Sequence, residues 1–313
     1  MTNKNIMTLA AALIFATVMG WWVSLPSKPV AVTVSDNASA AAIGETLHKA
    51  RLITSKTVFR VVVKLTGNSK SLKAGTYMIS PRTSVFGIVA RLASGKGTYE
   101  RVTIPEGFTA AEIAEALAAR KVVDKDRFTA AVKERKLEGY LFPDTYYFDR
   151  GLSETVVIDK MLREFEKNFT PAMAGKAEGL KMSREKIVTL ASIIEKEARR
   201  AEERPLIAGV FYNRLRKGWF LESCATVQYA LGGHKPKLSY KDLKVDSPYN
   251  TYKFYGLPPG PICSPGKASL DAALEPAGTD DMFFVVSDSG AHTFSRYYSD
   301  HIKNKRKKGA KAR

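Results

Sequence analysis

The feature that most restricts the fold of this chain is a segment that returns, without a gap, 70 positions further along. The sequence VTVSDNASAAAIGETLHKARLI, which begins at Val32, aligns with VTIPEGFTAAEIAEALAARKVV, which begins at Val102. In each copy a short apolar strand pattern is followed by apolar residues at helical spacing, and Ser39 or Thr109 stands where a helix N-cap is favoured. The repeat therefore predicts two small modules, each with a strand, a turn and a helix.

The segments between and after the two copies extend this pattern. VFRVVVKL is rich in β-branched residues and predicts a strand, LKAGTYMIS predicts a turn and a strand, and SVFGIVARLASGK predicts a helix. The aromatic segment LEGYLFPDTYYF, from Leu137 to Phe148, contains a turn at Pro143. Because these modules hold few candidate catalytic groups, they indicate a binding or spacing role.

From about Glu154 the apolar spacing becomes helical. The helices expected here lie in TVVIDKMLREFEKNF, SREKIVTLASIIEKEA, RPLIAGVFYNRLRKG, ATVQYALGG and ASLDAALEP. Before the last of them lies a loop rich in Pro, Gly and Tyr, and MFFVVSD predicts a closing strand. We therefore expect an α+β fold in which a mostly helical domain with a minor sheet follows the small β-α modules.

An uncharged run of 20 residues, Ile6–Leu25, lies near the N-terminus. At about 1.5 Å per residue, a helix of this length spans roughly 30 Å, the thickness of the bilayer hydrocarbon. Trp21 and Trp22 suit the membrane interface. A cleaved signal peptide is the competing interpretation, but the run is longer than a usual signal core and no clear A-x-A site follows it. We favour an uncleaved transmembrane helix, with residues 29–313 exported across the plasma membrane.

The chain is strongly basic, with a net charge of +18 at pH 7. Part of this charge is local, since KNKRKKGAKAR, from Lys303 onward, carries seven positive charges and no negative one. Such a balance favours a polyanion or an anionic membrane surface as a neighbour, although a solvated basic surface explains it equally well. A nucleic-acid partner is disfavoured, because it leaves the clustered motifs described next unexplained.

The sequence ASIIEKEARR contains two glutamates, Glu195 and Glu197, directly after an apolar run. On a helical wheel Lys196 falls opposite the apolar face, whereas Glu197 stacks one turn beyond Ile193. Partial burial disfavours an ionised carboxylate and raises its pKa, which is what a general acid requires near neutral pH. Of the two glutamates, Glu197 is therefore the better candidate for an acid.

The same helix end also has a simpler interpretation. Glu195 can pair with Arg199 at i+4, and Glu197 with Arg200 at i+3, as on any solvated helix. From the helix alone, this ion-pair interpretation is the favoured one.

Aromatic and polar residues further along the chain shift the balance toward a sugar-binding site. Tyr249, Tyr252 and Tyr255 offer flat stacking surfaces, and Asn250 adds a hydrogen-bond donor and acceptor, although a rigid, tyrosine-rich core loop explains them too. His292, alone after a strand, is more typical of a structural histidine. No phosphate loop, nucleophile elbow or metal-ligand motif occurs, so we expect no cofactor and no metal.

Several long motifs in a fixed order make the chain resemble a known family. In chain order they are KAGTY, VTIPEGFT, LEGYLFPDTYYF, LASIIEKEA, AGVFYNRLRKGWFLESCATVQYALG, SPYNTYKFYGLPPGPICSPG and AHTFS. Together they resemble the endolytic murein transglycosylases over nearly the whole chain after the apolar run. The resemblance implies a single-span plasma-membrane protein, N-terminus in the cytoplasm, with a LysM-like module and a catalytic domain on the cell-wall side.

The resemblance further implies a lyase that cleaves peptidoglycan strands internally between MurNAc and GlcNAc and leaves a 1,6-anhydro-MurNAc end. Such an enzyme would terminate or release nascent strands, beside penicillin-binding-protein synthases. By its place in the E-K-E motif, Glu197 is the general acid and base, with Glu195 as the alternate. The expected substrate-binding residues are Asn213, Gln228, Tyr249, Asn250 and Tyr252. The alternative function is a non-catalytic, membrane-anchored peptidoglycan-binding scaffold of the wall-synthesis machinery.

The resemblance gives the following domain order: a cytoplasmic tip and transmembrane helix over 1–28, a LysM-like β-α module over 29–98, a second module with the aromatic connector over 99–150, the catalytic domain over 151–302 and a basic tail over 303–313. One departure concerns Cys224 and Ala225, which stand where many members carry an Asp-Pro pair. A disulfide between Cys224 and Cys263 is one hypothesis for what replaces the aspartate, and two free thiols are the other.

Overall fold

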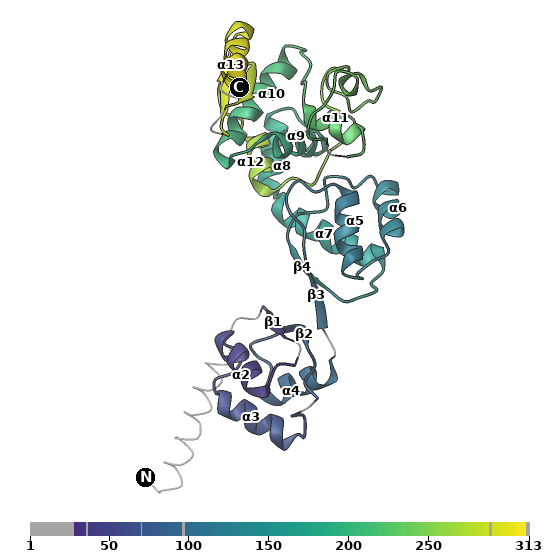
Figure 1. Cartoon of the computed structure of the whole chain (residues 1–313), viewed down its shortest axis with the longest axis vertical. Coiled ribbons are helices and arrows are strands. Elements are labelled where there is room, and N and C mark those ends of the chain that lie inside the picture. Colours follow the sequence, from purple (N-terminus) through teal and green to yellow (C-terminus); the bar gives the residue numbers. More distant parts are fainter. Residues whose placement is uncertain are drawn as a thin grey trace, which may run out of the picture. The chain divides into compact units, whose positions relative to one another are not determined.

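The computed structural model describes residues 28–310, apart from 36, 70, 96–97, 234 and 288–289. These residues separate into two compact units. Unit 1 holds the described residues up to Arg101 together with Tyr147–Arg150, and unit 2 holds Val102–Tyr146 and the residues from Gly151 onward. The mixture of helices and small sheets agrees with the expected α+β class (Figure 1).

The apolar run that predicts a transmembrane helix lies outside the described residues. Within the part of the chain that the structure describes, no helix is both long enough and apolar enough to cross a membrane.

Unit 1 is built from the first copy of the repeat and the segments that follow it. Its elements are β1 (Val30–Val34), α2 (Ala40–Lys49), α3 (Lys56–Leu65), β2 (Gly75–Ile79) and α4 (Val85–Ser94). Strands β1 and β2 pair antiparallel, with Val32 opposite Tyr77. The three helices pack their apolar residues against this pair, and the buried core includes Leu47, Phe59 and Leu92.

The segment VFRVVVKL forms helix α3, so the strand predicted from its β-branched residues is wrong. The helix begins after Ser55, whose side chain accepts a hydrogen bond from the backbone of Val58. Phe59, Val62 and Val63 are buried at i, i+3 and i+4 spacing, which matches one face of a helix. The N-cap and the one-sided burial together outweigh the weak strand preference of valine.

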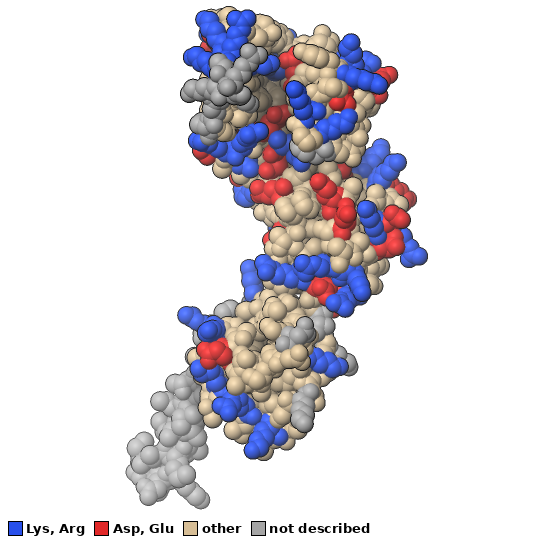
Figure 2. Space-filling model, viewed as in Figure 1, with Lys and Arg blue, Asp and Glu red and all other residues tan. Residues whose placement is uncertain are grey.

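Unit 1 is also basic. Between residues 28 and 101 the acidic residues are Asp36, Glu45 and Glu100, and lysines and arginines outnumber them. Figure 2 shows blue side chains outnumbering red ones on the visible face of this unit, whereas red side chains gather on unit 2.

Two sheets are present among the described residues. The first has four strands in the order β1-β2-β3-β4, and its last two strands, β3 (Thr98–Thr103) and β4 (Thr145–Phe148), are divided between the two units. The second is an antiparallel pair in unit 2, formed by β5 (Phe283–Val286) and β6 (His292–Ser295).

The repeat predicted from the sequence is confirmed, since β3 and helix α5 (Ala110–Ala119) reproduce the order of β1 and α2. Both helices begin at the expected N-cap, Ser39 for α2 and Thr109 for α5. Only the second copy has a complete capping box, because Glu112 returns a hydrogen bond to the backbone of Thr109 at 2.7 Å.

Unit 2 is mostly helical. Besides α5, its helices are α6 (Lys125–Glu134), α7 (Glu154–Asn168), α8 (Pro171–Gly179), α9 (Arg184–Glu197), α10 (Arg204–Arg216), α11 (Cys224–Ala230), α12 (Lys267–Leu274) and α13 (Tyr298–Ala310), with two short 3₁₀ turns, Ala201–Glu203 and Asp242–Lys244. Helix α9 is central, since α8, α10, α11 and α12 all pack on it. All eight residues from Ile187 to Ile194 are buried, so this helix forms the middle of the core.

Candidate active site

Both glutamates of the E-K-E motif leave the core at the C-terminal end of α9. The helix begins at Ser183, whose side chain accepts from the backbone of Lys186, and it ends at Glu197. Ala198 leaves the helical region, with φ −70° and ψ 123°. A long buried helix therefore delivers two carboxyl groups to the point where the chain turns away.

Glu197 is half-buried and accepts a 2.5 Å hydrogen bond from the hydroxyl of Ser223. Burial raises the pKa of the Glu197 carboxyl. The hydrogen bonds from Ser223 and from the backbone of Ala225, together with the electrostatic effects of His292 and Arg214, oppose this rise without cancelling it. Glu197 therefore holds its proton to a higher pH than an exposed glutamate does.

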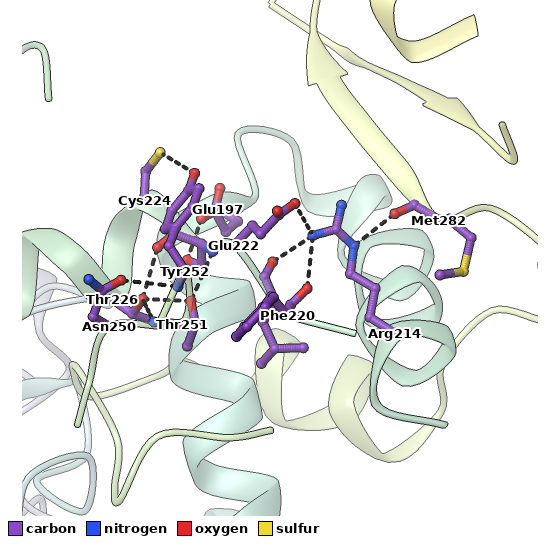
Figure 3. A network of polar contacts seen from close by, with 12 residues as sticks. Glu197, Arg214, Phe220, Glu222, Cys224, Thr226, Asn250, Thr251, Tyr252 and Met282 are labelled. Carbon is purple, nitrogen blue, oxygen red and sulfur yellow. Dashed lines mark hydrogen bonds and ion pairs between the residues drawn. The ribbon is translucent and has the colours of Figure 1, made fainter. Parts of the chain in front are cut away.

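A buried network fixes the position of Ser223. Its backbone N–H donates to the hydroxyl of Thr251 at 3.0 Å, and its carbonyl accepts from the hydroxyl of Thr226 at 2.8 Å. The two threonine hydroxyls lie 2.9 Å apart, and Figure 3 marks their contact with a dashed line. The preceding residue, Glu222, has a positive φ of 51°, which is uncommon for a residue other than glycine. The backbone of Ser223, which presents the hydroxyl to Glu197, is thus held on both sides.

Glu195 has quite different surroundings. Its Oε1 pairs with Arg204 at 3.2 Å, and its Oε2 accepts from the hydroxyl of Ser269 at 2.7 Å and from the backbone of Gly266 at 3.1 Å. The Glu195 side chain is only 7% exposed, and that of Arg204 only 13%. Both oxygens are therefore engaged in joining α9 to α10 and α12.

The helical spacing from which ion pairs with Arg199 and Arg200 were inferred does not continue past Glu197. Because the helix ends at Glu197, Arg199 and Arg200 do not continue its i+3 and i+4 rows. The arginine that pairs with Glu195 is Arg204, which lies beyond the turn.

Glu197 lies in the wall of a large cleft within unit 2, with a volume of about 1440 Å³. The cleft wall comes from the turn before α5, the segment after α6, the end of α9, helix α11 and the proline-rich loop. Tyr229 and Tyr249 stand in this wall with their rings 4.9 Å apart. The volume exceeds that of most small-molecule pockets and suits a polymeric ligand.

Four of the sequence-predicted residues line this cleft: Glu197, its alternate Glu195, Gln228 and Tyr249. Tyr252 lies beside it, because its hydroxyl is 3.2 Å from the thiol of Cys224, which also lines the cleft. Burial raises the pKa of Tyr252, so its phenol stays protonated.

Asn213 and Asn250 lie outside the cleft wall, and their amides bind backbone carbonyls. Asn213 donates to the carbonyls of Thr279 and Asp281, each at 2.8 Å. Asn250 donates to the carbonyls of Leu243 and Val245 at 3.0 and 2.9 Å. Asn213 thus holds the segment 279–281, and Asn250 holds the segment 243–245.

Sequence reasoning missed Glu138 as a cleft residue. Its carboxyl accepts from the backbone of Ala110 at 3.0 Å and from the hydroxyl of Tyr229 at 3.2 Å. Burial raises the pKa of Glu138 to about 7, although these hydrogen bonds oppose the rise. Gly139 has a positive φ of 84°, and a Cβ there would lie 2.4 Å from Pro261, so glycine is needed for this close packing. The sequence feature that could have identified Glu138 is the LEGYLFPDTYYF motif, which contains it.

His292 is held by a buried carboxylate, Glu203. Its backbone N–H donates to one oxygen of Glu203 and its Nδ1 lies against the other, each at 2.7 Å. Burial opposes ionisation of Glu203, but these contacts with His292 outweigh it and lower the Glu203 pKa. His292 lines the cleft in this fixed orientation.

The two cysteines are free thiols, so the disulfide hypothesis is wrong. The exposed Cys224 contacts Tyr252, whereas the buried Cys263 donates to the carbonyl of Ser192 at 3.3 Å. Each thiol is thus held by its own partner. Among the residues that the structure describes, no group of three or more His, Cys, Asp or Glu side chains could hold a metal ion.

Comparison with known proteins shows the family to which the chain belongs. Residues 32–307 match the YceG-like family. The chain is 35% identical over 305 residues to the endolytic murein transglycosylase of Bacillus subtilis, covering 89% of this chain and 84% of that protein. It is 32% identical over 322 residues to that of Streptococcus pneumoniae serotype 2, covering 88% of this chain and 58% of the relative. A crystal structure of a YceG-like protein from Listeria monocytogenes matches with a TM-score of 0.61 at 35% identity. The match covers 89% of this chain and 99% of that one.

Proposed function

The chain belongs to the YceG-like family, and from this premise we propose that Glu197 is the general acid of an endolytic murein transglycosylase. Its curated relatives are named endolytic murein transglycosylases, and the corresponding activity is that of a lyase acting on the glycan strands of peptidoglycan. The observation that carries the proposal for Glu197 is its half-buried carboxyl with a raised pKa in the wall of the large cleft.

In the proposed reaction Glu197 first donates a proton to the substrate and later accepts one from it. Glu197 protonates the glycosidic oxygen between MurNAc and GlcNAc, and the bond from that oxygen to the anomeric carbon breaks. The C6 hydroxyl of the same MurNAc then forms a bond to the anomeric carbon and returns its proton to Glu197. The product carries a 1,6-anhydro-MurNAc end, and no water is consumed.

This route needs only one free carboxyl, which agrees with the two environments at the end of α9. A retaining hydrolase would use a second carboxylate as nucleophile. Glu195 is unsuited to that role, because Arg204, Ser269 and Gly266 engage both of its oxygens.

The other residues have supporting roles. Ser223 orients the Glu197 carboxyl, Gln228 and Tyr249 contact the glycan from the cleft wall, and Tyr252 supports that wall through Cys224. For Asn213 and Asn250, the hydrogen bonds to backbone carbonyls support a positioning role rather than direct contact with the substrate.

The test is the product that the full chain makes from isolated sacculi. We expect anhydro-MurNAc ends in the muropeptide analysis, and we expect Glu197→Gln to reduce their formation at least a hundredfold. Glu178→Gln, an exposed change on α8 outside the cleft, is the matched control and should keep full activity. Reducing ends instead of anhydro ends would identify a hydrolase, and no product at all would favour the non-catalytic scaffold.

The remaining parts of the proposal concern the location of the protein. Ile6–Leu25 anchors the chain in the plasma membrane, with the N-terminus in the cytoplasm and the rest on the cell-wall side. The 20-residue uncharged run and its two tryptophans support this. The resemblance supports a LysM-like, glycan-binding module at 29–98 and an association with penicillin-binding-protein synthases, so that strands are cut as they are made.

A further inference from the structure

Unit 2 has a second hollow, outside the catalytic cleft, with a volume of about 550 Å³. Aromatic rings form most of its wall, and we name it the Trp219 pocket. Its lining residues include Trp219, Phe220, Tyr255 and Tyr298. None of its lining residues also lines the catalytic cleft.

The aromatic rings of the Trp219 pocket are both exposed and held in place. Trp219 is 45% exposed, Tyr255 67% and Tyr298 63%. Tyr255 stacks on Phe220 with ring centroids 3.8 Å apart and planes 16° apart. Trp219 and Tyr298 each rest on Phe283, at 5.8 and 5.6 Å. Exposed rings held rigidly in a concave surface point to a ligand, because contiguous exposed apolar surface is unfavourable in water.

Polar groups at the edge of the Trp219 pocket narrow the chemistry of that ligand. Glu222 is half exposed, and Arg214 fixes its carboxylate at 3.2 Å. Lys217 supplies a donor on the same wall. Flat rings beside an acceptor and a donor match a pyranose, which presents C–H groups on its faces and hydroxyls around its edge. A bilayer surface fits less well, because the pocket is concave and contains a carboxylate.

The chain connects this pocket directly to the active site. Phe220 is three residues before Ser223, which contacts Glu197, and three residues span at most about 10 Å. Figure 3 shows Glu222 between Arg214 and Glu197. One glycan strand is far longer than this separation.

We infer that the Trp219 pocket is a second saccharide-binding site, which holds a peptidoglycan strand at a distance from the bond that is cut. This inference rests on the proposed function, since it assumes that the substrate is a long glycan. A second site on the same polymer raises the affinity for long strands through effective concentration, and adds nothing for a fragment that fills only the cleft.

The test compares binding of two labelled ligands to the full chain, long uncrosslinked glycan strands and a tetrasaccharide of the same repeat. All proteins carry Glu197→Gln, so that no strand is cut during the measurement. Adding Trp219→Ala or Tyr255→Ala should raise the Kd for long strands about tenfold and leave the Kd for the tetrasaccharide unchanged. Tyr240→Ala is the matched control, because Tyr240 is 89% exposed and lines neither hollow.

Any of three results would overturn the inference. The first is that Trp219→Ala and Tyr255→Ala weaken long-strand binding no more than Tyr240→Ala does. The second is an equal loss of affinity for both ligands, which would mean that the pocket acts only through Ser223, and the third is weaker binding to phosphatidylglycerol vesicles with unchanged strand binding, which would assign the rings to a membrane. Because binding does not depend on turnover, failure of the proposed function is detected separately, by the absence of anhydro ends with the wild-type chain.

Discussion

The two sides of the C-terminal end of α9 carry the same kind of residue in different surroundings. On one side, Glu195 meets an arginine, a serine hydroxyl and a backbone N–H, and its side chain is almost fully buried. On the other side, Glu197 meets Ser223 and the backbone of Ala225 in the wall of a cleft. Burial raises the pKa of Glu197, because its partners do not fully compensate for the lost hydration.

The difference teaches that compensation, rather than burial alone, separates a carboxylate paired with a cation from a carboxyl group whose pKa is raised. Glu195 is paired with Arg204 and joins three helices. The hydrogen-bond donors and the cations that act on Glu197 do not offset its burial, so the free energy of ionisation stays high and a proton is available for transfer.

The largest expected effect is on stability, from Glu195→Gln. This change leaves Arg204 nearly buried beside a neutral amide, with Glu106 at 3.9 Å as its remaining acidic neighbour. We expect the free energy of unfolding to fall by about 3 kcal/mol, measured by urea denaturation. Glu197→Gln should leave it within about 0.5 kcal/mol. If both variants unfold at the same urea concentration, Glu195 and Glu197 contribute equally to stability and the proposed difference between them is wrong.

The next largest effect is on the pH dependence of activity, and it is tested by replacing the serine that contacts each glutamate. Ser223 donates to Glu197 and stabilises its ionised form, so Ser223→Ala raises the Glu197 pKa further. The acid must be protonated to act, so activity falls as pH rises through this pKa. The alkaline limb of kcat/KM should therefore move up by about one pH unit.

Ser269 provides the control for this experiment, because it donates to Glu195 instead. Ser269→Ala should lower stability by about 1 kcal/mol and leave the alkaline limb in place. A shift of the limb in both variants would show that the profile reports general damage to the end of α9.

The smallest effect concerns Glu138, whose burial also raises its pKa, to about 7. An unfolded glutamate titrates near 4.5, so the folded state retains a proton that the unfolded state loses. Stability from this group is therefore complete below about pH 4.5 and is lost as pH rises through 7. After a discount for its half-buried position, we expect a loss of about 1 kcal/mol, or roughly 2–4 °C in Tm.

Glu138→Gln should remove this loss, so that Tm falls less between pH 5 and pH 8 than in the wild-type chain. Glu134→Gln, an exposed change at the end of α6, should behave as the wild type. An identical fall in both variants would mean that Glu138 is ionised in the folded protein. Glu138 would then no longer resemble Glu197 as a carboxyl group whose burial raises its pKa.

Local patterns predicted much of the fold, and failed where two patterns overlap. The repeat, its N-caps at Ser39 and Thr109, and the long helices follow from spacing and capping, which are properties of a few neighbouring residues. VFRVVVKL failed, because a run of valines fits both a strand and the buried face of a short helix. The N-cap at Ser55 decided for the helix, together with the core that Phe59 enters.

The candidate site was predicted in part for the same reason. A helical wheel placed Glu197 near the apolar stripe, and the order of motifs related it to a family. The wheel did not reveal Arg204, since that partner lies after a break in the helix. It also gave no indication that the amides of Asn213 and Asn250 bind backbone carbonyls, or that Glu138 faces the cleft.

The sequence by itself determined most of the elements, the repeat, the resemblance to a family and the two candidate glutamates, because spacing and motif order are properties of the chain itself. Only the tertiary structure decided which partners surround each of those glutamates. The ionisation of a carboxyl depends on the charges, donors and water within a few ångströms of it. For Glu195 and Glu197 those neighbours come from α10, α12 and the segment around Ser223, which folding alone brings together.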